Sequence, residues 1–114
     1  MAIGVDIEDI SRFEDKSDEF LDRIYTPSEQ EYCFSKPNPA SHLAVRFCAK
    51  EAVIKALNSL GINHPRLSQI EVYHGENKAP KIRFFDAKYK DLTIEVSLSH
   101  DKTKAIAFVT IDKN

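Results

Sequence analysis

Residues 46–57 read RFCAKEAVIKAL, an apolar stretch that nevertheless carries four charged side chains. On a helical wheel at about 100° per residue, the apolar side chains of residues 43–60 form one wide arc. A helix that is apolar over most of its circumference must be covered on several sides, and in a small chain a second subunit could supply part of that cover. Two charges, Arg46 and Lys50, project from within the arc, whereas Glu51, Lys55 and Asn58 share the narrow remaining sector. We therefore predict a long, largely covered helix from about Ser41 to Leu60, with Gly61 as its C-terminal stop.

The sequence before this helix predicts one strand followed by helices. AIGVDI, residues 2–7, is short and rich in β-formers, and it contains Asp6. Apolar residues recur with helical spacing from Asp9 to about Ile24, although the polar stretch EDKSD interrupts the pattern. TPSEQEYC predicts a further helix, because Thr26 can cap it, Pro27 suits its first position and Glu29 completes a capping box.

The sequence after the long helix predicts strands. QIEVYH, KIRFF, LTIEVSLSH and KAIAFVTI are rich in β-branched and aromatic residues, and turn-like segments separate them. Helices thus fill most of the first half and strands the second. This segregation indicates an α+β fold, with a small antiparallel sheet packed on the long helix. At 114 residues and 13.0 kDa, with no linker or repeat, we expect a single domain, residues 1–114.

Composition excludes several classes of protein. The formal net charge of −2 gives no bulk reason to expect nucleic acid as a partner. No apolar run approaches the roughly 18 residues of a membrane span, and the N-terminus turns acidic by its sixth residue, unlike an export signal. We expect a soluble cytoplasmic protein in which Cys33 and Cys48 are reduced and buried.

The charges of the long helix have two interpretations. Glu51 and Lys55 are an i,i+4 pair that could simply stabilise a solvated face, and Arg46 and Lys50 could extend from a buried face to water. Alternatively, Glu51 could meet Asp6, whose carboxylate is unfavourable inside a strand unless a cation or hydrogen bonds balance it. Two such carboxylates suit Mg²⁺, which usually takes one or two carboxylates plus substrate phosphates.

SLSHD, residues 97–101, ends one predicted strand and also has two interpretations. His100 and Asp101 could be features of a turn, with Asp101 accepting hydrogen bonds from local backbone. Beside a two-carboxylate metal site, His100 would equally suit a phosphate or hydroxyl group.

Taken in order, GVDIEDISRF, FLDRIYTPSEQEYC, RFCAKEAVIKAL and SLSHDKTKAIAFV resemble the phosphopantetheinyl transferases, specifically the short acyl-carrier-protein synthase type. The match runs across almost the whole chain, and the combination is more specific than any one motif. The resemblance implies transfer of 4′-phosphopantetheine from coenzyme A to a serine of an apo carrier protein, with release of 3′,5′-ADP. It further implies the family's phosphopantetheinyl transferase fold and a homotrimer whose active sites lie at subunit boundaries.

The resemblance also implies roles for particular residues. Asp6 and Glu51 match the Mg²⁺ ligands, with Mn²⁺ as a possible substitute, and Glu51 is the candidate base for the serine proton. Lys55 would neutralise the phosphates, and His100 joins the catalytic set. Further matches are coenzyme A contacts at Arg46, Lys50, Lys55, Ser99 and His100, and carrier-docking arginines at Arg12 and Arg23.

Two departures from the family pattern and two rival functions stay open. Lys78 and Ala79 replace the glycine and lysine of the usual N-G-K-P loop, and lysine disfavours a positive φ. Asn58 stands where a glycine usually follows K-A-[FL], although asparagine tolerates the left-handed region. The preferred role is in primary fatty-acid metabolism. The alternatives are the same chemistry on a polyketide or other specialised carrier, and a non-catalytic oligomer that binds a nucleotide.

Overall fold

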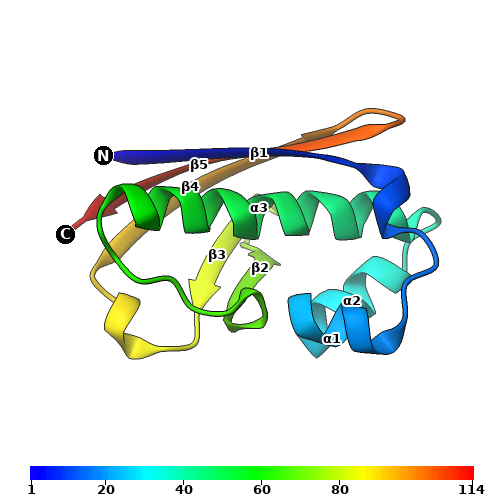
Figure 1. Ribbon diagram of the computed structural model, residues 1–114, viewed down its shortest axis with the longest axis horizontal. Coiled ribbons are helices and arrows are strands. Elements are labelled where there is room, and N and C mark those ends of the chain that lie inside the picture. The colour runs from blue at the N-terminus through cyan, green and yellow to red at the C-terminus, as the bar shows by residue number, and fades with distance from the viewer.

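The computed structural model describes all 114 residues and places one long helix between two layers of other elements (Figure 1). Above the helix lies a three-stranded antiparallel sheet in the order β1-β5-β4, and below it lie short helices and a separate two-stranded hairpin, β2-β3. The α+β fold is thus confirmed. The strands, however, form two sheets rather than the single one that the sequence predicted.

The helices and strands follow the predicted order with small shifts at their ends. The 3₁₀ turns are η1, η2 and η3, and the elements in chain order are β1 Ala2–Asp9, η1 Ile10–Phe13, α1 Asp18–Ile24, α2 Pro27–Phe34, α3 Pro39–Ser59, η2 Leu67–Gln69, β2 Ile70–His74, β3 Pro80–Phe84, η3 Ala87–Tyr89, β4 Leu92–His100 and β5 Lys104–Lys113. The helical pattern from residue 9 to 24 is divided, because residues 14–17 separate η1 from α1.

Local capping explains where the early helices begin. The Ser17 side chain accepts a hydrogen bond from the Phe20 backbone at the start of α1. Thr26 and Glu29 form the predicted capping box of α2, with Pro27 in the first turn. The long helix ends before Gly61, whose φ of +72° suits a residue without a Cβ.

Helix α3 approaches the central part of β1 unusually closely, and Gly4 makes that approach possible. A Cβ built on Gly4 would lie 1.9 Å from the backbone oxygen of Ala52, which is far inside van der Waals contact. The glycine of the GVDI motif therefore serves helix–sheet packing and brings the neighbouring Asp6 against the helix.

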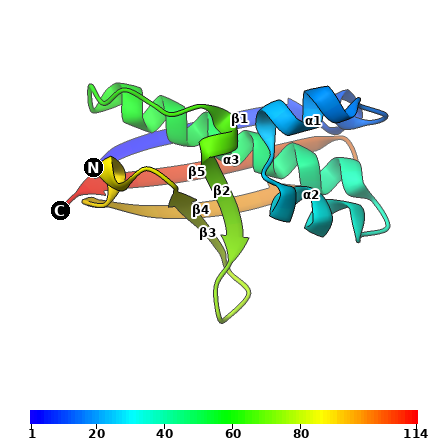
Figure 2. The ribbon, with the colours of Figure 1, turned by 90° about the horizontal axis from the view of Figure 1, so that it is seen from below.

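The chain itself covers most of the long helix, which corrects one sequence-based inference. The sheet packs on one side of α3, while η1, α2 and strand β2 lie against other sides (Figure 2). Alanines at positions 44, 49, 52 and 56 are fully buried within the single chain. The apolar circumference of the helix is therefore no evidence for a second subunit.

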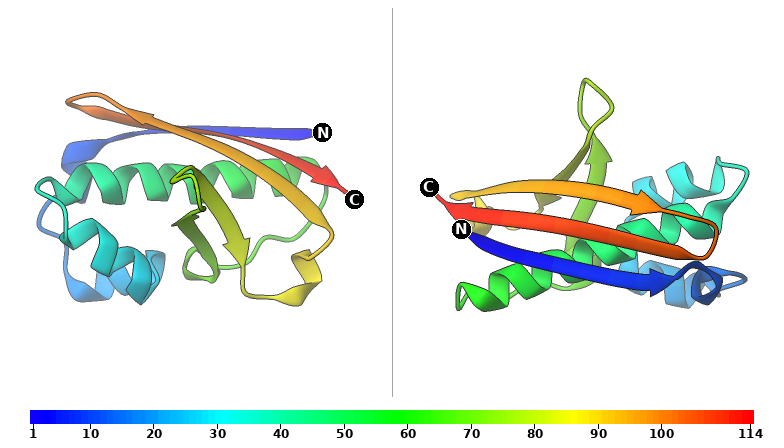
Figure 3. Two further views of the ribbon diagram at one scale, coloured as in Figure 1. Left: turned by 180° about the vertical axis from the view of Figure 1, so that it is seen from behind. Right: turned by 90° about the horizontal axis from the view of Figure 1, so that it is seen from above.

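An unpartnered apolar surface does exist, but it lies on the sheet. β1 and β5 turn alternate side chains away from α3, and Figure 3 (right) shows no element over that outer face. Large apolar side chains on this face are exposed: Ile3, Val5, Ile7, Ile106 and Phe108. Strands with one buried face usually carry polar residues on the other, so this face departs from an ordinary solvated sheet.

The hairpin loop keeps a left-handed residue despite the replacement of its glycine. Lys78 has φ of +64° and donates its backbone N–H to the carbonyl of Gly75, while the Asn77 side chain accepts from Ala79 N. The turn that the Lys78 substitution put in doubt is therefore formed, at the conformational cost that a side chain incurs there.

Candidate functional site

The two predicted carboxylates meet where β1 crosses α3. Asp6 is largely buried, its side chain only 11% exposed, and its Oδ2 atom has no hydrogen-bond partner. Glu51 lies close enough that the charge of Asp6 raises its pKa, although desolvation by burial is the larger cause. An unpartnered buried carboxylate oxygen with a second carboxylate nearby is unfavourable without a cation, so this site is suited to one.

Lys55 supplies one positive charge at this site. Its ammonium donates to the Val5 carbonyl at 2.9 Å and lies 3.2 Å from Asp6 Oδ1. The lysine lies one helical turn after Glu51 and is about half exposed. A pair of that exposure contributes little to stability, whereas its position leaves the ammonium free to meet an incoming anion.

A third carboxylate, Glu8, was missed by sequence reasoning. It lies two residues after Asp6, so both side chains emerge on the helix-facing side of β1. The pKa of Glu8 is raised by desolvation and then by the neighbouring Asp6 carboxylate, while Arg12 opposes the shift. The i,i+2 spacing in GVDIE could have indicated this proximity. No group of three or more His, Cys, Asp and Glu side chains is arranged to hold a metal ion by itself.

Lys50 does not lie in the site, which corrects its predicted contact with coenzyme A. Its ammonium is fully buried and donates to Glu29 Oε1 at 2.6 Å and to the carbonyls of Ile24 and Leu67. All three donors of the ammonium are thereby used. Lys50 instead joins α3 to the N-terminus of α2, since Glu29 also accepts from the backbone of Thr26 and Val72.

Arg46, Ser99 and His100 meet in a separate cavity of about 220 Å³. The Arg46 side chain is only 3% exposed, its guanidinium lies 4.4 Å from the ring centroid of Tyr32, and its Nε has no hydrogen-bond partner. Three predicted coenzyme contacts are thus brought together around an unpartnered buried donor. The cavity also has two histidines that sequence reasoning missed, His42 from α3 and His74 from β2.

His100 lies on the far side of α3 from the carboxylates, so its predicted catalytic role is not supported within one chain. Glu8, Ala105 and His100 are paired in one row across β1, β5 and β4, which places His100 two strand spacings, about 10 Å, from β1. Cys48 lies over the middle strand, with its thiol donating to the Ala105 carbonyl at 3.4 Å. Asp101 Oδ1 accepts from the backbone of Thr103 and Lys104, as the turn interpretation expected.

The two predicted carrier-docking arginines occupy different environments. Arg12 pairs with Glu8, and its positive charge opposes the rise in the pKa of Glu51. Arg12 therefore lies beside the carboxylates. Arg23 is three-quarters exposed, pairs with Glu19 at 2.7 Å and lines a cavity of about 860 Å³ together with His64 and Arg66. Helix α1 also carries Asp18, Glu19 and Asp22, so Arg23 does not lie in a purely basic patch.

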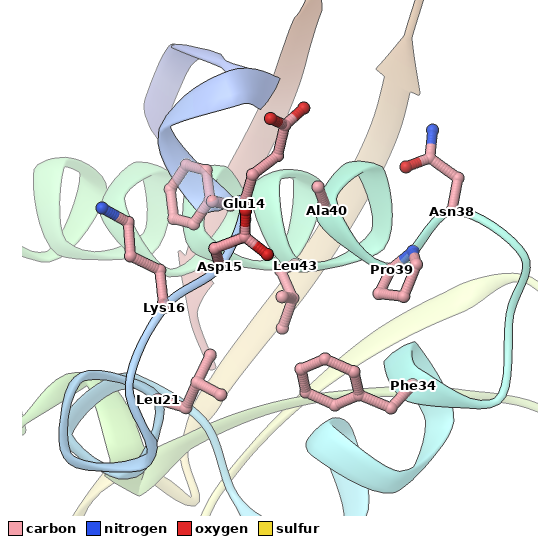
Figure 4. A pocket seen from close by; sticks show the side chains of 10 residues that line it. Glu14, Asp15, Lys16, Leu21, Phe34, Asn38, Pro39, Ala40 and Leu43 are labelled. Carbon is pink, nitrogen blue, oxygen red and sulfur yellow. The ribbon is translucent and has the colours of Figure 1, made fainter.

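Another cavity of about 470 Å³ lies between η1, α1, α2 and the start of α3, and it contains none of the predicted site residues (Figure 4). Phe34, Leu21 and Leu43 point into it, and Glu14, Asp15 and Lys16 line one side. This cavity differs from the one at Arg46 in two ways: charged residues of both signs line it, and it has no unpartnered buried hydrogen-bond donor.

Comparison with known proteins agrees with this geometry. The model of the 4′-phosphopantetheinyl transferase superfamily matches residues 2–109. The chain is 39% identical over 116 residues to holo-[acyl-carrier-protein] synthase of Chlorobaculum parvum, covering 97% of each. It is 33% identical over 118 residues to part of the fatty acid synthase subunit alpha of Schizosaccharomyces pombe, covering 97% of this chain and 6% of that protein.

A solved structure extends the likeness to the whole fold. The holo-(acyl-carrier-protein) synthase of Bacillus anthracis, in complex with CoA (3′,5′-ADP), superposes with a TM-score of 0.81 at 28% identity, covering 99% of this chain and 96% of that one. The carboxylate pair, the glycine that seats it and the full-length matches lead to one conclusion: the chain belongs to the 4′-phosphopantetheinyl transferase superfamily.

Proposed function

We propose that this chain transfers 4′-phosphopantetheine from coenzyme A to a serine hydroxyl of an apo acyl carrier protein, releasing 3′,5′-ADP, as part of fatty acid biosynthesis. The observation that carries the proposal is the juxtaposition of Asp6 and Glu51, with one buried carboxylate oxygen unpartnered, in a chain of this superfamily. The likeness to a segment of a fatty acid synthase subunit supports the pathway.

The residues present fit Mg²⁺, with Mn²⁺ as a substitute. Asp6 and Glu51 would hold the ion. Two carboxylates without a complete protein cage are what Mg²⁺ commonly uses when substrate phosphates supply further oxygens. When bound, the ion would neutralise the negative charge of the coenzyme's pyrophosphate and of the leaving nucleotide.

The protein's own side chains would perform the remaining chemistry. Glu51 is the candidate base for the serine proton, because its carboxylate lies beside Asp6 at the edge of the helix–strand junction. Lys55, with its ammonium exposed beside Asp6, would stabilise charge on the phosphates. Arg46, Ser99 and His100 would bind another phosphate of the coenzyme, a binding role rather than a catalytic one for His100.

The separation of these two groups supports active sites at subunit boundaries. Arg46 and Glu51 are five residues apart on α3, so their side chains diverge by about 140° around the helix axis. A homotrimer would bring the carboxylates of one subunit toward the phosphate-binding cavity of the next. The exposed apolar outer face of β1 and β5 is the surface that such an assembly would bury.

For carrier docking, we propose that an acidic helix of the carrier meets Arg12 and Arg23 near the entrance to the carboxylate site. Opposite charges across such an interface orient the partner and speed association. We place the reaction in the cytoplasm, with which the two free, buried cysteines agree. No helix of this structure has the length and apolar character needed to cross a membrane.

Intact-mass spectrometry tests the proposed reaction. An apo acyl carrier protein incubated with this chain, coenzyme A and Mg²⁺ should gain the mass of one phosphopantetheine group. The double variant Asp6→Asn/Glu51→Gln and a chelator-treated sample should produce no gain. Transfer only to a polyketide carrier would move the activity to specialised metabolism. No transfer to any apo carrier by the folded protein would refute the transferase assignment and favour a binding role.

A further inference from the structure

The cavity at Arg46 is lined by more histidine than a phosphate site requires. Three of the four histidines of the chain meet there: His42 from α3, His74 from β2 and His100 from β4. The ring centroids of His42 and His100 are 6.5 Å apart, and Tyr32 lies between His42 and His74 at 5.8 and 4.8 Å. Three distant segments of the chain thus converge on one aromatic, ionisable cavity.

The charged groups facing this cavity all have the same sign. Arg46 is buried at its floor, and Lys36 lies 4.7 Å from the Tyr32 ring centroid. The lining side chains include no aspartate or glutamate, so nothing within the cavity balances the cations. The Arg46 Nε–H, buried without an acceptor, is a second sign that an acceptor arrives from outside. The cavity is therefore built for an anion.

The protonation of two histidines is coupled to that anion. Desolvation and then the charge of Arg46 hold the pKa values of His42 and His74 below the usual 6.5, with Lys36 contributing to both. His100 and His74 contribute further to the effect on His42. A phosphate dianion bound in this cavity would instead raise the pKa values of His42 and His74, because an opposite charge within a few ångströms favours the protonated histidine.

We propose that His42 and His74 bind the phosphate monoester of coenzyme A in their protonated forms, so that affinity for the coenzyme falls as pH rises. This inference rests on the proposed use of coenzyme A as substrate. Since binding raises the histidine pKa values, protons are taken up with the ligand between the free and bound values. Affinity is then greatest below that interval and decreases through it, by up to about tenfold per pH unit for each proton taken up.

Direct binding measurements between pH 6.5 and 8.5 test the coupling, because a phosphate monoester with a second pKa of about 6 is mostly the dianion throughout that range. Titration calorimetry without metal should show the dissociation constant of coenzyme A rising about tenfold across this range. Dephospho-coenzyme A, which lacks the monoester but keeps the pyrophosphate, should show a much flatter dependence. An equal slope for the two ligands would overturn the proposal.

Variants separate the histidines from other causes. His42→Asn/His74→Asn removes both protonation sites with similar side-chain size, and it should bind coenzyme A about tenfold more weakly at pH 6.5 with little remaining slope. His64→Asn, at the only histidine outside the cavity, is the matched control and should keep the wild-type slope. Thermal melting checks that each variant is folded. A wild-type slope in the folded double variant would refute the role of the histidines.

The same samples, assayed for carrier modification by mass spectrometry, distinguish failure of this inference from failure of the proposed function. Phosphopantetheine transfer with pH-independent coenzyme binding would overturn only the histidine proposal. pH-dependent coenzyme binding without transfer would support the histidines and refute the transferase. Absence of coenzyme binding at every pH would overturn both.

Discussion

Two neighbouring charged residues on α3 have different roles: Lys50 stabilises the fold, and Glu51 is available for chemistry. Lys50 is fully buried and saturated with hydrogen bonds, whereas Glu51, the next residue, lies at the edge of the helix–strand junction. The helix rotates about 100° between them, which is sufficient to move from core to site.

Removing the Lys50 ammonium should destabilise the fold severely. Lys50→Met would leave Glu29 buried without its cation, and breaking a buried pair in this way costs about 3–5 kcal/mol. Urea unfolding followed by circular dichroism measures the loss. Lys50→Met/Glu29→Gln should recover part of it, because no unpaired charge is left behind. A Lys50→Met protein as stable as the wild type would show that the pair is not structurally important.

Asp6 should behave in the opposite way. Asp6→Asn removes a carboxylate whose Oδ2 is buried and unpartnered, together with its repulsion of Glu51 and Glu8. The neutral amide of asparagine has a smaller desolvation cost than a carboxylate, and the half-exposed pairing with Lys55 offsets little of that gain. Without metal at pH 7, the variant should therefore unfold at the same or higher urea concentration, while carrier modification falls by about 100-fold or more. Lower stability would mean that Asp6 supports the fold.

At the scale of elements, the contact of β1 with α3 sets the geometry of the site. The strand can lie this close only because position 4 has no side chain, and the same contact carries Asp6 to Glu51. The turn at Gly61 also uses glycine, but there the requirement is the positive φ and not space, since nothing lies within 4 Å of the position of its Cβ.

These two glycines should therefore differ in their tolerance of alanine. Gly4→Ala forces a shift of strand against helix backbone and should cost more than about 4 kcal/mol or prevent folding. Gly61→Ala should cost only about 1–2 kcal/mol, the penalty of a left-handed residue with a Cβ. Denaturant unfolding of both variants provides the comparison. Comparable losses for the two would contradict the close-approach argument.

At the scale of the whole molecule, the outer face of the sheet has no partner within the chain, although a row of large apolar side chains is exposed there. Phe108→Asp places a charge in the middle of this face without touching α3. We expect the variant to remain folded but to dissociate into monomers and lose carrier modification, because each proposed site needs two subunits. Size-exclusion chromatography with light scattering measures the mass.

Phe85→Asp is the matched control, since Phe85 is as exposed as Phe108 but lies just after β3, away from that face. It should keep the oligomeric state of the wild type. A wild-type protein that is monomeric and active would remove the basis for shared sites.

The sequence by itself determined the order of the elements, the long helix and the α2 capping box, because these depend on local periodicity and capping. The proximity of Asp6 and Glu51 was expected from the family resemblance alone, since it depends on a contact between distant segments. Only the tertiary structure decided what surrounds each side chain. The wheel placed both Arg46 and Lys50 in the apolar arc. Packing gave Lys50 three acceptors, whereas it left the Nε of Arg46, a residue that lines a cavity, with none.

The sequence likewise could not show that His42, His74 and His100 converge, since they lie on a helix, a hairpin and a strand whose mutual positions are set by long-range packing. It also placed the unpartnered apolar surface on the helix, whereas the fold covers the helix and exposes one face of the sheet. The periodicity of a sequence shows only which faces of a helix or strand are apolar. The packing of the layers decides which of these faces is covered within the chain.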